Sequence, residues 1–178
     1  MEILTTRLRL RRAEAGDLEA FRRILTDPRA MRYWSTPPHP DVETTRRWLD
    51  AMVSAPASES CDYVLEYRGE VVGKAGCWRL PEVGYILHPD VWGLGLADEA
   101  MRAILPHLFA TFPVDALSAD VDPRNAASIA LLIRLGFVET RRARRTWLVG
   151  EEWCDSVYFA LTRPPPAPDH GPDPAPTA

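Results

Sequence analysis

Residues 88–97 read His88-Pro89-Asp90-Val91-Trp92-Gly93-Leu94-Gly95-Leu96-Ala97. They lie between a strand-like run, residues 83–87, and a helix-like run, residues 98–105. Gly93 and Gly95 let the backbone turn tightly and approach a ligand closely, and the free N–H groups of a first helical turn point to the same place. Because the helix dipole favours negative charge at that end, the stretch predicts a binding site for phosphate.

The composition excludes several classes of protein. With 178 residues, the chain is long enough for one domain with a substantial core. A formal net charge of −4 argues against a general nucleic-acid binder. No apolar run is long enough to cross a membrane and no signal peptide precedes the first strand-like segment, so we expect a cytoplasmic protein without a membrane partner. Cys61, Cys77 and Cys154 lack the spacing of metal ligands, so we expect reduced thiols and no metal.

The chain ahead of the glycine loop predicts a strand, two helices and a three-stranded meander. Leu8 and Leu10 alternate with arginines within residues 3–11, which is typical of a half-exposed strand. Apolar residues recur at helical spacing in two segments, and Asp17 is interpreted as the N-cap of the first. From Cys61 onward the period changes to two. The expected helices are residues 18–25 and 42–53, and the expected strands are 63–67, 71–78 and 82–87.

The second half of the chain alternates helices and strands. A helix over residues 97–111 contains Pro106, which is expected to kink it or to end its regular part. A strand, a short helix closed by Gly136 and a final hairpin follow, over residues 114–121, 126–135, 137–147 and 153–161. The proline-rich residues 163–178 are expected to form a disordered tail outside a domain of residues 1–162. This order predicts an α+β fold whose mixed sheet contains one parallel β-α-β unit.

A dinucleotide-binding oxidoreductase is one interpretation of the glycine loop. Gly93 and Gly95 follow a strand and precede a helix, and Asp120 or Asp122 ends the next strand, where such sites place a ribose-binding carboxylate. However, Asp98 occupies the third glycine position, where its charge and bulk oppose close packing near a pyrophosphate. Too few residues follow to build the remaining parallel strands. The sequence therefore disfavours this interpretation.

Four stretches carry a more specific resemblance, and they occur in order between residues 4 and 161. They are Leu4-Thr5-Thr6-Arg7-Leu8-Arg9-Leu10-Arg11; Glu82-Val83-Gly84-Tyr85-Ile86-Leu87-His88-Pro89 with Trp92 to Ala100; Asn125-Ala126-Ala127-Ser128 with Leu132-Ile133-Arg134-Leu135-Gly136-Phe137; and Glu152-Trp153-Cys154-Asp155-Ser156-Val157. Together they resemble the GNAT superfamily of N-acetyltransferases, in particular its ribosomal-protein-alanine acetyltransferase-like branch. The resemblance implies a mixed, mostly antiparallel central sheet flanked by helices, with a splayed parallel pair of strands.

The same resemblance implies a site for acetyl-CoA (coenzyme A) as co-substrate. Backbone N–H groups would hold its pyrophosphate at Trp92, Gly93, Leu94, Gly95, Leu96 and Ala97. A backbone N–H near Leu87 or His88 would stabilise the oxyanion. Asn125 would contact the pantetheine arm, and it also suits the N-cap of the following helix. Ser128 would donate a proton to the leaving thiolate, although it also fits an ordinary helix serine.

The acceptor side of the site needs a base and a pocket. An ammonium has no lone pair, so it must lose a proton before it attacks a thioester. Glu82 is expected to be this base because it opens the strand before the glycine loop. Asp155 is its rival and Asp120 ranks third; each also suits a salt bridge. Proximity supplies part of the rate, so a dedicated base is not essential. The expected pocket walls are Tyr33, Trp34 and Trp78, although aromatic residues at such positions also form cores.

The expected function is transfer of an acetyl group from acetyl-CoA to a primary amine, by direct attack while both substrates are bound. The amine would be a small molecule or the N-terminal amine of a protein, and by resemblance a homodimer would be unsurprising. A non-catalytic acyl-CoA-binding module is the alternative from another class of function. The dinucleotide-binding oxidoreductase ranks third.

Overall fold

The computed structural model describes residues 2–165 and contains an eight-stranded sheet with the strand order β1-β2-β3-β4-β5-β6-β8-β7. The tail expected beyond residue 163 lies outside the described residues from residue 166 onward. The strands and α-helices are β1 (Ile3–Leu4), β2 (Leu8–Arg11), α1 (Leu18–Leu25), α2 (Val42–Ser54), β3 (Cys61–Tyr67), β4 (Glu70–Arg79), β5 (Glu82–Leu87), α3 (Leu96–Thr111), β6 (Ala116–Val121), α4 (Ala126–Arg134), β7 (Val138–Val149) and β8 (Glu152–Thr162).

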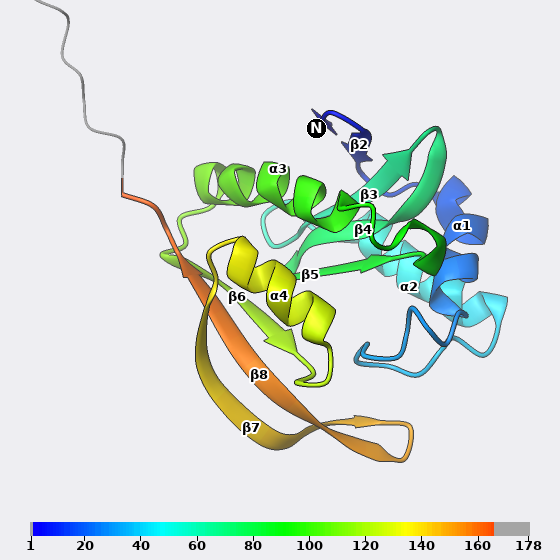
Figure 1. The fold of residues 1–178 in the computed structure, drawn as a ribbon. Helices are drawn as coiled ribbons and strands as arrows, with labels where there is room; N and C mark the ends of the chain where they lie inside the picture. The colour runs from blue at the N-terminus through cyan, green and yellow to red at the C-terminus, as the bar shows by residue number, and fades with distance from the viewer. Residues whose placement is uncertain (1, 166–178) are drawn as a thin grey trace, which may run out of the picture.

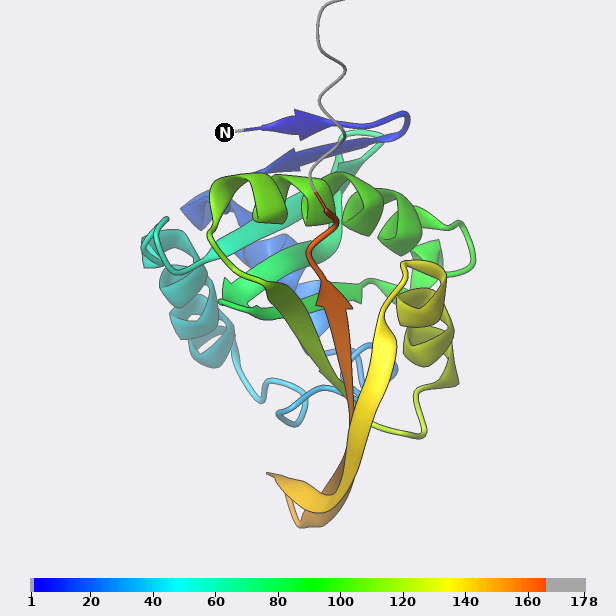
Figure 2. The ribbon, with the colours of Figure 1, turned by 90° about the vertical axis from the view of Figure 1, so that its left-hand side faces the viewer.

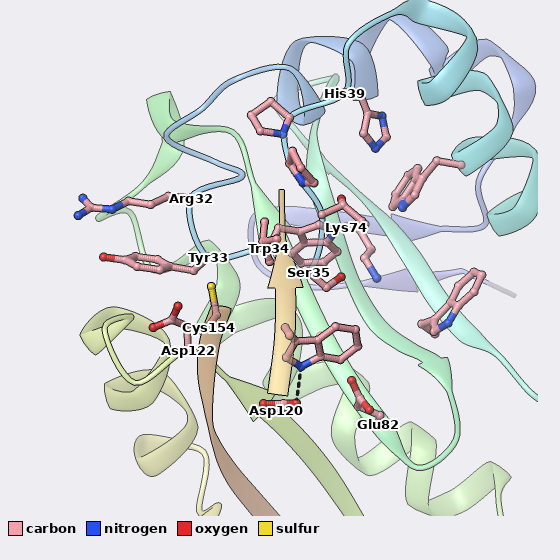
Figure 3. Close-up of a pocket in the computed structure, with 18 of the residues that line it drawn as sticks. Arg32, Tyr33, Trp34, Ser35, His39, Lys74, Glu82, Asp120, Asp122 and Cys154 are labelled. Atoms are coloured by element: carbon pink, nitrogen blue, oxygen red, sulfur yellow. Dashed lines mark hydrogen bonds between the residues drawn. The ribbon is translucent and has the colours of Figure 1, made fainter. Parts of the chain in front are cut away.

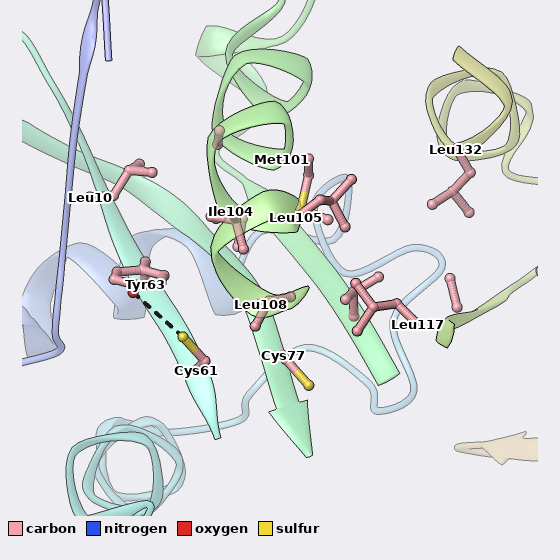
Figure 4. Packing of buried hydrophobic residues seen from close by; sticks show 14 of the residues in the cluster. Leu10, Cys61, Tyr63, Cys77, Met101, Ile104, Leu105, Leu108, Leu117 and Leu132 are labelled. Atoms are coloured by element: carbon pink, nitrogen blue, oxygen red, sulfur yellow. Dashed lines mark hydrogen bonds between the residues drawn. The ribbon is translucent and has the colours of Figure 1, made fainter. Parts of the chain in front are cut away.

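Helices cover both faces of the sheet, with α3 and α4 on one face and α1 and α2 on the other (Figure 1). Alternation along β3 explains the two cores, because Tyr63 and Leu65 point toward α3 while Val64 points toward α1 and α2. Figure 4 shows the larger core, in which Ile104 and Leu108 of α3 face the strands. The apolar faces of the helices thus pack on the two faces of the sheet and form two separate cores.

The only parallel pairing recorded among residues 2–165 joins β5 and β6, and it consists of a single register pair, Glu82 with Ser118. The N–H of Ser118 also donates to the Pro81 carbonyl at 2.9 Å. Beyond this point the two strands diverge, as Figure 1 shows. The mixed sheet with a splayed parallel pair is therefore confirmed. The gap lies directly beside the glycine loop, which follows β5.

The β7–β8 hairpin reaches well beyond the body of the molecule (Figure 2). Its register shifts between Ala143 and Trp147, where an irregularity interrupts the ladder. This bend brings Trp147 back over the end of β6, where its indole N–H meets Asp120. Among the described residues, no helix combines the length and apolar character needed to cross a membrane.

Three local expectations differ from the structure. The predicted first strand is two short strands, because the chain turns between Leu4 and Leu8. The side chain of Asp17 does not cap α1; its carboxylate instead pairs with Arg11 and accepts the N–H of Glu14 in a capping box of the preceding 3-10 turn, Ala15–Asp17. The α3 helix continues past Pro106 to Thr111, so of the two effects expected of this proline the earlier end of the helix is wrong. Pro106 and Arg102, whose carbonyl loses its helical partner, both face solvent, so water replaces the missing bond.

Candidate functional site

The glycine loop forms a cradle of free backbone donors. Gly93 and Gly95 have φ values of 76° and 75°, a left-handed conformation that favours glycine. The N–H of Trp92 donates to Pro89 and that of Glu99 to Gly95. Between them, the N–H groups of residues 93–98 find no hydrogen-bond partner within the described part of the chain. At a helix N-terminus, such a run of donors suits a phosphate group.

The N-terminal hairpin holds this loop in place. Glu99, in the first turn of α3, accepts from the Arg7 Nε at 2.6 Å, the Arg7 backbone N–H at 2.7 Å and the Thr5 hydroxyl at 2.6 Å. Arg7 also donates to the Leu94 carbonyl at 2.8 Å. Burial works to raise the pKa of Glu99, but these hydrogen bonds outweigh it and hold the pKa below its usual value. The sequence pattern of residues 4–11 did not reveal this anchoring role.

A cavity of about 700 Å³ runs from the glycine loop to the first turn of α4. Most of the predicted cofactor residues line it, namely Leu87, Trp92, Gly93, Gly95, Leu96, Ala97, Asn125 and Ser128. His88 and Leu94 do not line it. The free N–H groups at one end and the passage along β5, lined by Tyr85, Ile86 and Leu87, fit a ligand with a phosphate and an extended arm.

The backbone of β5 offers one further donor to this passage. The His88 N–H already donates to the Val72 carbonyl at 2.8 Å, on the β4 side of the strand. Leu87 is opposite Gly73 in the antiparallel register. Because the adjacent residues His88 and Val72 are hydrogen-bonded, Leu87 and Gly73 form a non-hydrogen-bonded pair. The Leu87 N–H therefore points away from β4 and into the gap beside β6. Of the two backbone donors expected at the end of β5, only that of Leu87 remains available.

Ser128 is held by two neighbours at the inner end of this cavity. Its N–H donates to the Asn125 side chain at 3.1 Å, so Asn125 does cap α4. Its Oγ lies 2.6 Å from the Tyr85 hydroxyl oxygen, and Tyr85 also lines the cavity. Burial raises the pKa of Tyr85 to about 12, so its hydroxyl stays protonated and able to donate at neutral pH. Tyr85 lies in the stretch of residues 82–89 that resembles the family, but its position in the sequence did not identify it as a site residue.

A second cavity of about 970 Å³ lies among α2, the loop before it, the sheet and the β7–β8 hairpin (Figure 3). The three predicted pocket residues, Tyr33, Trp34 and Trp78, all line it. Arg32, Tyr33 and Trp34 line both cavities, so the two spaces meet at this loop. The two cavities are therefore neighbours in the structure.

Glu82 and Asp120 lie at the same end of the second cavity, across it from His39 (Figure 3). Glu82 stands where β5 and β6 part. Loss of hydration raises the pKa of the Glu82 carboxyl, and the negative charge of Asp120 raises it further. Asp120 accepts a hydrogen bond from the Trp147 indole at 2.9 Å. The predicted base thus has as its neighbour the carboxylate that ranked third for the same role.

Asp155, the rival base, also lines the second cavity. Its Oδ1 accepts the backbone N–H of Arg145 at 2.9 Å, next to the irregularity in the hairpin. Arg145 has a φ of 53°, which is unfavourable for a side chain of its size. This bond gives Asp155 a clear role in shaping the hairpin.

Two buried polar groups in the second cavity were not expected. Lys74 pairs with the buried Asp62 at 2.7 Å and lies 5.5 Å from the Trp34 ring. His39 contacts the Thr45 hydroxyl at 3.1 Å through Nδ1, and burial lowers the pKa of His39. No signal in the local sequence pattern separates these groups from surface residues. Within residues 2–165, no cluster of three or more His, Cys, Asp or Glu side chains is arranged to hold a metal ion.

Comparison with known proteins agrees with this arrangement. The family model described as acetyltransferase (GNAT) domain matches residues 7–138. The uncharacterized N-acetyltransferase p20 of Bacillus licheniformis is 31% identical over 174 residues, which cover 92% of this chain and 97% of that protein. The ribosomal protein uS5-alanine N-acetyltransferase of Escherichia coli is 31% identical over 102 residues, 53% of each chain.

Solved structures share the fold. A GNAT-family acetyltransferase from Bacillus anthracis has a TM-score of 0.78 at 24% identity, covering 91% of this chain and 98% of that one. The ribosomal L7/L12 alpha-N-protein acetyltransferase RimL, solved in complex with coenzyme A, has a TM-score of 0.80 at 18% identity with the same coverage. The family match spans β2, the glycine loop and α4. This chain therefore belongs to the GNAT family of acetyltransferases.

Proposed function

We propose that this protein transfers an acetyl group from acetyl-CoA to a primary amine by direct attack, with both substrates bound at once. One observation carries the proposal: the cavity lined by the glycine loop and the cavity lined by Glu82 meet at residues 32–34, beside the gap between β5 and β6. Holding two reactants at such a junction makes their reaction effectively unimolecular.

The first cavity would hold the acyl donor. The unpaired N–H groups of residues 93–98 suit its pyrophosphate, and the gap beside β5 suits an arm that hydrogen-bonds like an added strand. The solved complex of RimL with coenzyme A supports this assignment by analogy of fold. When bound, acetyl-CoA supplies the activated thioester. The Leu87 N–H, which points into the gap, would stabilise the negative charge that develops on the thioester oxygen.

Glu82 would remove the proton from the ammonium, directly or through a water molecule. Its raised pKa makes it a stronger base than an ordinary carboxylate, and it lines the second cavity, where the amine would bind. The nitrogen then forms the new N–C bond while the C–S bond breaks and its electron pair goes to sulfur. The second proton that the nitrogen loses balances the proton that the sulfur gains.

Ser128 would assist departure of the sulfur. The Tyr85 hydroxyl remains protonated and lies 2.6 Å from Ser128 Oγ, so it can donate to that oxygen. This arrangement leaves the Ser128 hydrogen free to point into the cofactor cavity. Ser128 is therefore proposed as the hydrogen-bond donor to the leaving sulfur, and Tyr85 as the residue that positions it.

A ligand titration followed by a turnover assay tests the proposal. We expect acetyl-CoA and CoA to raise the Tm and NAD(H) to leave it unchanged, because a ligand at 100 times its Kd stabilises a protein by about 2.7 kcal/mol. Turnover is then measured as thiol released in the presence of amines, including peptides that begin with alanine because the Escherichia coli relative is named for an alanine. Absence of CoA binding overturns the proposal. Binding without turnover on any amine would instead favour a non-catalytic acyl-CoA-binding module.

A further inference from the structure

The second cavity has an aromatic wall whose ring faces are open. Trp78 is 53% exposed and Trp147 is 45% exposed, although both line the cavity. Within the described residues, neither indole stacks on another ring or on a cation. Two half-exposed indoles in the wall of one cavity offer a large apolar surface to a ligand that binds there. This wall therefore suits a ligand with a flat apolar body.

Two carboxylates without an ion pair lie at the same end of the cavity (Figure 3). Of the other two that line the space, Asp122 pairs with Arg124 at 2.6 Å, and Asp155 accepts the neutral backbone N–H of Arg145 and keeps its charge. Glu82 and Asp120 form no ion pair within the described part of the chain. These two carboxylates mark the place for one ammonium group. Because the Trp147 indole is bonded to Asp120 at 2.9 Å, the carbon atoms next to that ammonium would lie against an indole.

Arginines supply the positive charge of the cavity. Arg32, Arg47 and Arg79 line it and form no ion pair within the described residues, and Arg79 is opposite Glu82 in the β4–β5 register, whereas Lys74 is already paired with Asp62. A second ammonium on the ligand would meet these cations, and a carboxylate on the carbon that bears the amine would meet Glu82 and Asp120. Both arrangements place like charges together, which lowers affinity. The cavity therefore disfavours polyamines and free amino acids.

Building on the proposed acetyl transfer, we infer that the acceptor is a primary amine joined by a short link to a flat apolar body, with neither a second ammonium nor a carboxylate beside the amine. An arylalkylamine has this chemistry, and so does a chain N-terminus that begins with an aromatic residue, because its neighbouring group is a neutral amide. The open indoles, the pair of free carboxylates and the surrounding cations each restrict the acceptor independently.

Matched pairs of amines test the inference by kcat/KM for thiol release at saturating acetyl-CoA. We expect 2-phenylethylamine to exceed ethylamine, which lacks the ring, and L-phenylalanine, which adds the carboxylate, by about 10- to 100-fold each. Pentylamine should exceed 1,5-diaminopentane, which adds a second ammonium. L-phenylalaninamide should be accepted. A higher kcat/KM for L-phenylalaninamide than for 2-phenylethylamine favours a chain N-terminus as the acceptor, and a lower value favours a free arylalkylamine.

Two variants connect these preferences to the cavity. Trp78→Ala should reduce the advantage of 2-phenylethylamine over ethylamine, whereas Trp153→Ala should not, because Trp153 is similarly exposed at 47% but does not line the cavity. Asp120→Asn should narrow the discrimination against L-phenylalanine. Equal or faster turnover of the diamine or the free amino acid overturns the inference, and so does failure of 2-phenylethylamine to react. Acetyl-CoA binding with turnover of other amines would leave the proposed acetyl transfer intact.

Discussion

The indole N–H of Trp147 donates to Oδ2 of Asp120 at 2.9 Å, and Asp120 in turn raises the pKa of Glu82. Three strands contribute to this chain of contacts, since Trp147 lies on β7, Asp120 on β6 and Glu82 on β5. The negative charge of Asp120 favours the protonated form of Glu82. The closing hairpin therefore contacts the residue whose charge acts on the candidate base.

Asp120→Asn should shift the pH dependence of catalysis. The variant removes a negative charge that favours the protonated form of Glu82, so the pKa of Glu82 falls and a larger fraction is ionised at acidic pH. We expect the acid limb of the kcat profile to move to lower pH. Asp122→Asn is the matched control, because Asp122 lines the same cavity but does not contribute to the raised pKa of Glu82. An equal shift in both variants would contradict the role of Asp120.

Gly93→Val should weaken CoA binding without unfolding the protein. The valine would need a φ of 76°, and straining a side chain into this region costs about 1–3 kcal/mol. The loop would therefore relax and turn its N–H groups away from the phosphate. Gly69→Val is the control, because Gly69 has a φ of 82° in the β3–β4 turn and an added Cβ meets no atom within 4 Å at either glycine. Calorimetry should show at least a tenfold higher Kd for the Gly93 variant only. Equal affinities would remove the glycine loop from the site.

Glu99→Gln should destabilise the protein and loosen the loop. The carboxylate accepts from Arg7 and Thr5, and hydrogen bonds to charged groups contribute about 1.5–3 kcal/mol. We expect about 1–2 kcal/mol here, because Arg7 is 40% exposed and the ion pair is screened. Asp98→Asn should cost less, since its partner Arg102 lies at i+4 on an exposed surface. Urea unfolding at pH 7 compares the variants.

The same pair of variants gives a pH test. The pKa of Glu99 is lowered in the folded protein, so its stabilisation is present above the unfolded value near 4.5 and is lost as pH falls through the lower folded value. The difference in unfolding free energy between wild type and Glu99→Gln should therefore shrink below that pH. A difference that grows with acidification would mean that Glu99 is not held as a carboxylate.

The sequence predicted those features of the site that depend on a few consecutive residues. Gly93 and Gly95 revealed their conformations through their position between a strand and a helix, and Asn125 revealed its capping role at a helix start. Pairings between distant residues gave no such signal. Tyr85 and Ser128 are 43 residues apart and meet only because α4 packs over β5. Trp147 reaches Asp120 only because of a register shift within β7, which no periodicity predicts.

For Asp17 the local sequence predicted a role that the side chain does not have. A short acidic residue before an apolar run is typical of an N-cap, but the carboxylate of Asp17 is nearly buried and pairs with Arg11 at 2.6 Å. A charged partner contributed by a neighbouring strand outweighs the capping preference, which depends on local sequence alone. The sequence predicts the role of a residue such as Gly93 because that role depends on the backbone conformation of its own segment. It does not predict the role of Asp17, because the partner of that side chain lies on a neighbouring strand.

Ser128→Ala and Tyr85→Phe should lower turnover while leaving acetyl-CoA binding nearly unchanged. If Tyr85 acts only by directing the Ser128 hydroxyl, Tyr85→Phe should lower kcat by roughly 3- to 10-fold, the effect of one hydrogen bond. Ser128→Ala should lower it further, and the double variant should be no slower than Ser128→Ala. Tyr85→Phe retains the ring that packs in the cavity, so a packing defect alone would not produce this pattern. Additive losses would mean that the two hydroxyls act separately, and unchanged kcat in both variants would leave Ser128 as an ordinary helix residue.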